Sequence, residues 1–334
     1  MNICICGGGN LGHVCAGFLA NRGHHVSILT TKPERWSSEI EIVAPDGDFV
    51  GKLASISSEP SEVIPQAEMV LICLPGFAIH DELVKIKPHI SRSCIVGTIV
   101  SSTGFFFEAF KELPQDTTLF GFQRVPFISR TIEYGKKAEL KGYKETLSVA
   151  IEQTDAKEPI RKKLEQLFEK PVTLLDSYYE VSLSNSNPLL HPSRLYTMWK
   201  DWQPGTIYPR NPQFYAEWPL EASALLIQMD EEFQNLLNIL GLKPGSIPSV
   251  LDYYESTDAE SLTNKLQTIK AFQGIYSPMK EVPGGFIPDF SSRYFTEDFP
   301  YGMRFIVETA HTHHVPIPTI EIVYNWGISI QQNS

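Results

Sequence analysis

Residues 2–12 read Asn2-Ile3-Cys4-Ile5-Cys6-Gly7-Gly8-Gly9-Asn10-Leu11-Gly12. An apolar strand leads directly into the pattern G-x-G-x-x-G, and the apolar stripe of residues 11–22 behind it predicts a helix. In this pattern Gly7 makes a tight turn, Gly9 lets the backbone approach a pyrophosphate, and Gly12 allows close helix–strand packing. The backbone at Asn10 and Leu11 then presents the helix N-terminus to the phosphate charge. The segment therefore predicts a dinucleotide-binding site.

Further apolar, β-branched runs follow, with room for helices between them, as is typical of parallel strands buried on both faces. These runs cover residues 25–30, 69–74, 94–100 and 117–123. A Pro45-Asp46-Gly47 turn predicts a hairpin from residues 39–44 and 48–54. After about residue 155 strand signals become sparse, and helical periodicity dominates, as in residues 220–240. We predict an α/β Rossmann domain, doubly wound with a mostly parallel sheet, over residues 1–170, and a mainly α-helical domain over residues 171–334.

The end of the second strand bears on which dinucleotide binds. An NAD site usually places Asp or Glu there, on the ribose hydroxyls. This chain instead has Thr30-Thr31-Lys32, with Arg35 close behind. Hydroxyls and cations suit a 2′-phosphate, so we expect NADP in preference to NAD; the alternative is that the two cations are solvated loop charges. Leu74-Pro75-Gly76 and residues 101–104 end the next strands, where they would line the nicotinamide.

Charge and composition exclude several classes of partner. The formal net charge is −11, whereas nucleic acid or an anionic membrane would require a basic surface. No stretch approaches the roughly 20 apolar residues of a membrane span, and the first residues show no signal peptide. All five cysteines lie in apolar runs, and we interpret them as buried thiols rather than metal ligands. We expect a cytoplasmic protein with no nucleic-acid partner, no membrane partner and no metal site.

Three segments of the helical half stand apart from the rest. They are Asn187-Pro188-Leu189-Leu190-His191-Pro192, Gln213-Phe214-Tyr215 and the segment from Ser292 to Gly302, Ser-Arg-Tyr-Phe-Thr-Glu-Asp-Phe-Pro-Tyr-Gly. Together with the N-terminal glycines they resemble the opine dehydrogenases, the octopine and nopaline dehydrogenase family. In that family a Rossmann domain precedes a helical domain with N-P-x-x-H, and a later R-x-x-x-x-D segment runs into P-Y-G. The resemblance covers nearly the whole chain in order.

The resemblance implies a reductive condensation of small-molecule substrates. The amine of an amino acid and the carbonyl of a 2-oxo acid such as pyruvate form an imine, which NAD(P)H reduces. By matching position, His191 would be the acid/base residue and Asp298 its carboxylate partner. Arg293 would bind a substrate carboxylate or orient the carbonyl, and Asn187 and Tyr215 would contact substrate.

The chemistry of these residue types agrees with those roles. Histidine moves protons near neutral pH, a carboxylate fixes its tautomer, and the fork of arginine suits a carboxylate. Structural alternatives remain: His191 could cap a turn, Asn187 could cap a helix, and Asp298 could favour a helix N-terminus. Arg293 and Asp298 could also form a purely structural ion pair.

Aromatic residues are concentrated in one part of the helical half. They are Trp199, Trp202, Tyr208 and Trp218. Such residues could edge the amino-donor pocket and favour an apolar or bulky donor, or they could simply pack in the core.

Two other functions remain open at this point. A ketopantoate reductase, or another 2-oxo or hydroxy acid dehydrogenase, shares the N-terminal architecture but usually relies on Lys and Glu in the helical half, where we find no equally well-placed Lys. The second is a non-catalytic dinucleotide sensor, which would have no need to keep His, Arg and Asp together. An exposed apolar face on the helical half would favour a homodimer.

Overall fold

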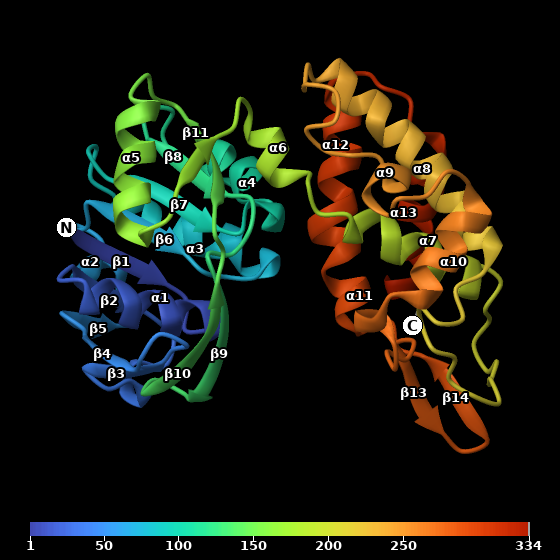
Figure 1. Cartoon of the computed structure of the whole chain (residues 1–334), viewed down its shortest axis with the longest axis horizontal. Helices are drawn as coiled ribbons and strands as arrows, with labels where there is room; N and C mark the ends of the chain where they lie inside the picture. Colours follow the sequence, from blue (N-terminus) through green and yellow to red (C-terminus); the bar gives the residue numbers. More distant parts are fainter. Residues whose placement is uncertain (333–334) are drawn as a thin grey trace. The chain divides into compact units, whose positions relative to one another are not determined.

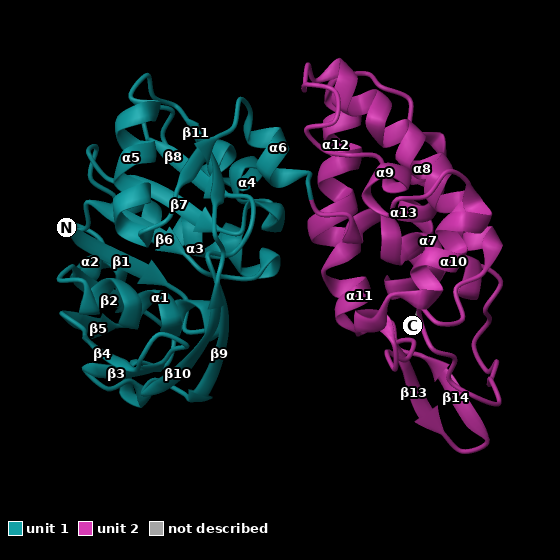
Figure 2. Ribbon diagram, viewed as in Figure 1, with its two compact units in different colours: residues 1–184 teal, residues 185–334 magenta. Residues whose placement is uncertain are grey.

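The computed structural model describes residues 1–332. The chain forms two compact units, unit 1 over residues 1–184 and unit 2 over residues 185–334 (Figure 2). Residues 171–184, which the sequence analysis assigned to the second domain, lie in unit 1. The reason is that β12 (Val172–Leu174) pairs in parallel with β11 (Leu147–Glu152), and α6 (Tyr178–Ser182) packs against the same strand.

Unit 1 is built on a large sheet in which every neighbouring pair of strands is parallel except β11 and β8. The order across the sheet is β12, β11, β8 (Leu119–Phe122), β7 (Ile95–Ile99), β6 (Met69–Ile72), β1 (Asn2–Cys6), β2 (His25–Leu29) and β5 (Ser55–Ser57). Its central strands are buried on both faces, which explains their continuous apolar runs. The predicted Rossmann arrangement is confirmed (Figure 1).

Helices cover the two faces of this sheet. Those of unit 1 are α1 (Asn10–Asn21), η1 (Pro33–Arg35), α2 (Pro60–Val63), α3 (Gly76–Ile86), η2 (Lys87–His89), η3 (Ser101–Thr103), α4 (Phe105–Glu112), α5 (Lys157–Phe168) and α6. One apolar cluster contains side chains of α1 and α5, and a second contains side chains of α2, α3 and α4. Each face of the sheet therefore has its own core.

A second, smaller sheet covers the outer side of α1. Its order is β4 (Phe49–Lys52), β3 (Glu39–Val43), β10 (Lys137–Tyr143) and β9 (Phe127–Glu133). The hairpin β3–β4 was predicted from the sequence, whereas β9 and β10 were not. Phe18 of α1 packs against Phe127 of β9 and Phe49 of β4, at ring distances of 4.7 and 6.4 Å. As a result α1 lies between two sheets, with its cluster of apolar side chains shared by both.

Unit 2 is mainly helical, as expected, with one short hairpin. Its elements are α7 (Asn187–Trp199), α8 (Leu220–Ile239), α9 (Val250–Tyr253), α10 (Ala259–Thr268), η4 (Lys270–Phe272), β13 (Met279–Val282), β14 (Gly285–Pro288), α11 (Arg293–Thr296), η5 (Phe299–Met303), α12 (Arg304–Thr312) and α13 (Pro318–Gln332). Aromatic side chains dominate its interior: Trp199, Phe214, Trp218, Phe295 and Phe299 are almost fully buried. Between residues 1 and 332 no helix has the length and apolar character needed to cross a bilayer.

Candidate functional site

The glycine turn of unit 1 has the geometry that a dinucleotide requires. A Cβ added at Gly12 would lie 2.0 Å from the carbonyl oxygen of Gly7, so only glycine lets α1 begin this close to β1. Gly9 is different: its φ is −83°, which any residue adopts, and no atom lies within 4 Å of an added Cβ. Neither the backbone nor the packing requires glycine at this position. The open space beside it, at the N-terminus of α1, fits a pyrophosphate.

A cavity of about 100 Å³ adjoins this turn. Of the residues predicted to bind cofactor, Gly7, Thr30, Thr31 and Leu74 line it. The side chain of Thr30 is buried, whereas Thr31 is exposed. The end of β2 and the end of β6 therefore meet at the glycine turn, as they must in a parallel sheet whose carboxyl ends share one edge.

The other predicted cofactor residues lie around this cavity in different ways. The Oδ1 atom of Asn10 accepts a hydrogen bond from the backbone N–H of Thr131 in β9 (2.9 Å). Leu11 packs against the apolar cluster of α1, and Pro75 occupies the N-cap position of α3. Lys32 is exposed and precedes η1.

Arg35 is also exposed, and its guanidinium lies 4.7 Å from the ring centroid of Tyr134. Tyr134 lines the cavity together with Gly8, Glu82 and Lys85, and the sequence analysis missed all four. Glu82 and Lys85 lie on α3, which begins within the predicted Leu74-Pro75-Gly76 segment. This closeness in the sequence could have indicated that both residues lie near the glycine turn. Burial raises the pKa of the Glu82 carboxyl.

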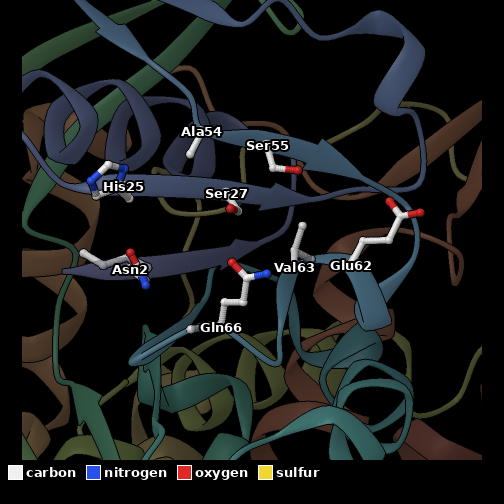
Figure 3. A pocket seen from close by; sticks show the side chains of 10 residues that line it. Asn2, His25, Ser27, Ala54, Ser55, Glu62, Val63 and Gln66 are labelled. Carbon is white, nitrogen blue, oxygen red and sulfur yellow. The ribbon is translucent and has the colours of Figure 1, made fainter.

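A second hollow of unit 1 is shown in Figure 3. Asn2, His25 and Ser55, which line it, are the first residues of β1, β2 and β5. Because these strands are parallel, the hollow lies at their amino ends, whereas the glycine turn follows the carboxyl end of β1. It includes none of the predicted site residues and lies apart from the cofactor cavity.

In unit 2 the structure brings together three residues that are far apart in the sequence. The Nδ1 atom of His191 lies 2.7 Å from Oδ2 of Asp298, and its Nε2 atom lies 2.8 Å from the hydroxyl of Tyr215. A carboxylate can only accept, so Nδ1 carries the proton. Nε2 of the neutral imidazole is then the acceptor for the Tyr215 O–H. The side chains of His191 and Asp298 are only 12% and 13% exposed, which strengthens their interaction.

The contact between α7 and η5 explains why His191 and Asp298 meet. A Cβ at Gly302 would lie 2.5 Å from Cγ of Pro188, so this glycine allows the two helices to approach. Asp298 immediately precedes η5, a π-helical turn that continues into α12. Its side chain caps no helix and instead reaches His191. The N-P-x-x-H and D-F-P-Y-G segments therefore form a single structural unit.

The loop that carries Tyr215 is held by a buried cation. Arg194, one turn beyond His191 on α7, donates from Nη2 to the carbonyl oxygen of Glu217 (2.9 Å). Burial lowers the pKa of the Arg194 guanidinium to about 10, so it remains charged at neutral pH. The ring of Tyr215 stacks on Phe272 with centroids 4.1 Å apart. Burial, more than any neighbouring charge, raises the pKa of Tyr215, which therefore stays a phenol that can donate to His191.

Arg293 does not pair with Asp298. Its Nε and Nη2 atoms donate to the two carboxylate oxygens of Glu297, at 2.7 and 2.9 Å. The structural alternative of an Arg293–Asp298 ion pair is therefore wrong. The Arg293 side chain is 84% exposed, and a pair this exposed contributes little to stability. Asn187 is exposed as the first residue of α7, and Ser186 occupies the N-cap position, so Asn187 is not a helix cap.

The aromatic residues of unit 2 divide between core and surface. Trp199 and Trp218 are each 1% exposed and belong to the core, which favours the packing interpretation for both. Trp202 instead lines an apolar hollow beside the hairpin β13–β14, together with Phe290. Tyr208 forms an isolated bridge with Phe286 of β14.

Family models match both units of the chain. Residues 174–330 match the alpha-helical domain of the NAD/NADP octopine/nopaline dehydrogenases, and residues 3–130 match the ketopantoate reductase PanE/ApbA family. The opine dehydrogenase of Haliotis discus hannai is 29% identical over 98% of this chain and 89% of its own length. The chain is therefore similar to the opine dehydrogenases over nearly its whole length.

Solved structures of this family show the same fold. An octopine dehydrogenase solved with NADH and L-arginine has a TM-score of 0.85 at 27% identity, covering 98% of this chain and 89% of the other. An octopine dehydrogenase solved with NADH and pyruvate has a TM-score of 0.82 at 25% identity, with coverage of 97% and 88%. The resemblance inferred from the sequence motifs is confirmed.

Proposed function

We propose that this protein is an NAD(P)H-dependent oxidoreductase that condenses an amino acid with a 2-oxo acid such as pyruvate. The amine adds to the carbonyl carbon, water leaves to form an imine, and reduction of the C=N bond gives a secondary amine dicarboxylate. The observation that carries the proposal is the pair of hydrogen bonds that link Asp298, His191 and Tyr215 in unit 2. The opine dehydrogenase relatives support the same reaction class.

His191 is the acid/base residue in this proposal. Its Nδ1–H is held by Asp298, so Nε2 is left to accept or return a proton during carbonyl addition and loss of water. When Nε2 is protonated, the nearby carboxylate of Asp298 stabilises the imidazolium. The hydroxyl of Tyr215 fixes the position of Nε2 before substrate binds and, by rotating, would then bind a substrate oxygen or nitrogen.

Arg293 and Asn187 would bind the substrates. Arg293 is exposed and pairs with Glu297 of its own helix turn, so a substrate carboxylate could replace that partner at little cost. Asn187 precedes His191 by four residues on α7, which places both side chains on the same face of the helix.

NAD(P)H, when bound, supplies the hydride. Unit 1 would form the dinucleotide-binding domain and unit 2 the substrate and catalytic domain, so the boundary lies at residue 184 instead of the expected residue 170. Gly7, Gly9 and Gly12 would hold the pyrophosphate together with the backbone at Asn10 and Leu11. Hydroxyls and cations at the end of β2 favour the 2′-phosphate of NADP over NAD, and the end of β6 would contact the dinucleotide as well. The residues in these two places are Thr30, Thr31, Lys32, Arg35, Leu74 and Pro75.

The proposal is tested by incubating the purified protein with pyruvate and NADPH or NADH, with and without a panel of amino acids. We expect cofactor oxidation only when an amino acid is present, and a product whose mass equals that of both substrates less one oxygen. The match of residues 3–130 to ketopantoate reductases makes a 2-oxo acid reductase the second candidate. Cofactor oxidation by the oxo acid alone, with a hydroxy acid as product, would favour that candidate.

We further propose that the protein acts in the cytoplasm as a homodimer. All five cysteines are free and buried, which suits a reducing compartment. Large apolar side chains are exposed on unit 2, among them Leu220 and Ile239 of α8 and Ile322 of α13. Sedimentation analysis of the purified protein tests the oligomeric state.

A further inference from the structure

The turn between β9 and β10 docks on the glycine turn, although more than 120 residues separate them. The backbone N–H of Gly135 donates to Nε2 of His13, at 2.6 Å. Four residues earlier, in β9, the backbone N–H of Thr131 donates to the side chain of Asn10. His13 and Asn10 both belong to the first turn of α1. The helix that would receive the pyrophosphate therefore also fixes the position of this hairpin.

The hairpin is held by the buried, hydrogen-bonded side chain of His13. His13 is fully buried and its ring stacks on Trp36 at a centroid distance of 4.2 Å. Its Nδ1 bonds the carbonyl oxygen of Gly9 (2.9 Å), so this nitrogen carries the proton and Nε2 is the acceptor for Gly135. Gly135 has φ of +75°, and a Cβ there would lie 2.1 Å from the carbonyl oxygen of Arg35. Only glycine allows the turn to come this close.

This arrangement places Tyr134 over the cofactor cavity. Its hydroxyl lies 3.4 Å from Oγ1 of Thr30, and a Cβ added at Gly8 would be 2.6 Å from that hydroxyl. Its ring is held at the edge of His13, with centroids 5.1 Å apart, and beneath the guanidinium of Arg35. The ring is thus fixed by packing, while among residues 1–332 the hydroxyl has a single, long hydrogen bond, which a ligand can replace.

Thr30 follows β2, the position where dinucleotide-binding folds bind the 2′ oxygen of the adenosine ribose. No carboxylate lies at this position in the sequence Thr30-Thr31-Lys32. We propose that Tyr134 is a cofactor-binding residue: its hydroxyl, beside Thr30, binds the 2′ substituent of the adenosine ribose. That substituent is a hydroxyl in NAD and a phosphate in NADP, and a phenol can donate to either. The inference rests on the proposed dinucleotide site.

The test compares wild type with Tyr134→Phe, which keeps the ring and its packing but removes the hydroxyl. Binding of NADH, NADPH and 2′-deoxyadenosine NADH is measured by nicotinamide fluorescence, without substrate or turnover. We expect the variant to bind NADH about 3- to 10-fold more weakly if the hydroxyl contacts the 2′-OH. If it contacts the 2′-phosphate, we expect a loss of about tenfold or more for NADPH. The 2′-deoxy dinucleotide should bind both proteins equally.

Tyr143→Phe is the matched control, because the hydroxyl of Tyr143, at the other end of β10, bonds Asp46 and lines no part of the cofactor cavity. It should leave all three affinities unchanged. An equal loss for all three dinucleotides in Tyr134→Phe, or no loss for any, overturns the inference. If wild type binds none of the three, the proposed dinucleotide site itself is wrong.

Discussion

The two candidate sites of this protein are built in opposite ways. In unit 1 the cofactor site is made of backbone: a strand, a turn and a helix N-terminus that follow one another within twelve residues. In unit 2 the acid/base site is made of side chains, and His191, Tyr215 and Asp298 come from segments up to 107 residues apart. The comparison teaches that a backbone site can be recognised from local spacing, whereas a side-chain site is assembled only by packing.

The same contrast separates the residues proposed to bind the cofactor from the residue proposed to transfer protons. Glycines in the turn of unit 1 control how closely a ligand can approach, but they transfer no protons. The imidazole of His191 is the proposed proton-transfer group but has no part in forming the glycine turn. Changes in the two units should therefore affect different measured quantities, and the predictions below use this difference.

The largest effect is expected for His191→Ala. Loss of a positioned acid/base group should lower kcat by about 10²- to 10⁴-fold. Affinity for NADPH or NADH should stay near the wild-type value, because the predicted cofactor residues all belong to unit 1. The measurements are steady-state kinetics and nicotinamide fluorescence titration. A parallel loss of cofactor affinity in this variant would contradict the assignment of separate roles to the two units.

Gly9→Ala and Gly12→Ala should differ in their effects on protein stability and on dinucleotide affinity. At Gly12 the added methyl meets a backbone oxygen at 2.0 Å and should destabilise the protein by about 1–3 kcal/mol. At Gly9 the backbone tolerates alanine and the space is open, so the melting temperature should not fall. The same methyl should nevertheless weaken dinucleotide binding about tenfold or more by occupying the space of the pyrophosphate.

Thermal melts and fluorescence titrations of the two variants separate these outcomes. If Gly9→Ala bound cofactor as tightly as wild type does, the pyrophosphate could not lie against Gly9, and the proposed cofactor site would need revision.

The smallest effect concerns pH and His13. Burial lowers the pKa of His13 below its usual value of 6.5, so the unfolded chain binds more protons than the folded chain as the pH falls below that value. Its contribution to stability is therefore complete above about pH 6.5 and decreases as the pH falls towards the folded-state pKa. His13→Gln, which cannot titrate, should lose less stability than wild type between pH 7 and pH 5.

Melting temperatures measured across this range give the comparison. Other groups, such as His24, whose pKa burial also lowers, and Glu82, whose pKa burial raises, are present in both proteins and cancel in the difference. Identical pH profiles for the two proteins would show that folding does not lower the pKa of His13, and would contradict this prediction.

Much of unit 1 could be predicted because its signals are local. The run of residues 2–6, the glycines and the apolar stripe of α1 predicted β1, the turn and the helix to within one residue. The hairpin β9–β10 was missed, because its half-buried strands contain charged residues and no apolar run. Tyr134 belongs to that hairpin, and nothing near it in the sequence indicates that it reaches Thr30.

In unit 2 the sequence predicted α8 well but not α7. Pro192 lies inside α7, where it removes a backbone hydrogen bond, and prolines of this kind usually indicate a turn. The family resemblance, rather than periodicity, identified His191 and Asp298, whose hydrogen bond the structure then showed. The pairing of Arg293 with Glu297, which are four residues apart in one helical turn, was not predicted from the sequence.

Helix α1 lies between two sheets, with the small sheet packed against the side that faces away from the large sheet. Its first turn is in addition bonded to the β9–β10 hairpin through Asn10 and His13. The end of this helix at which we propose that phosphate binds is thereby preorganised: its entropy is lost when the chain folds and not when ligand arrives. A dinucleotide should therefore bind to a turn that hardly moves, and hydrogen exchange at this turn should be slow even in the apoprotein.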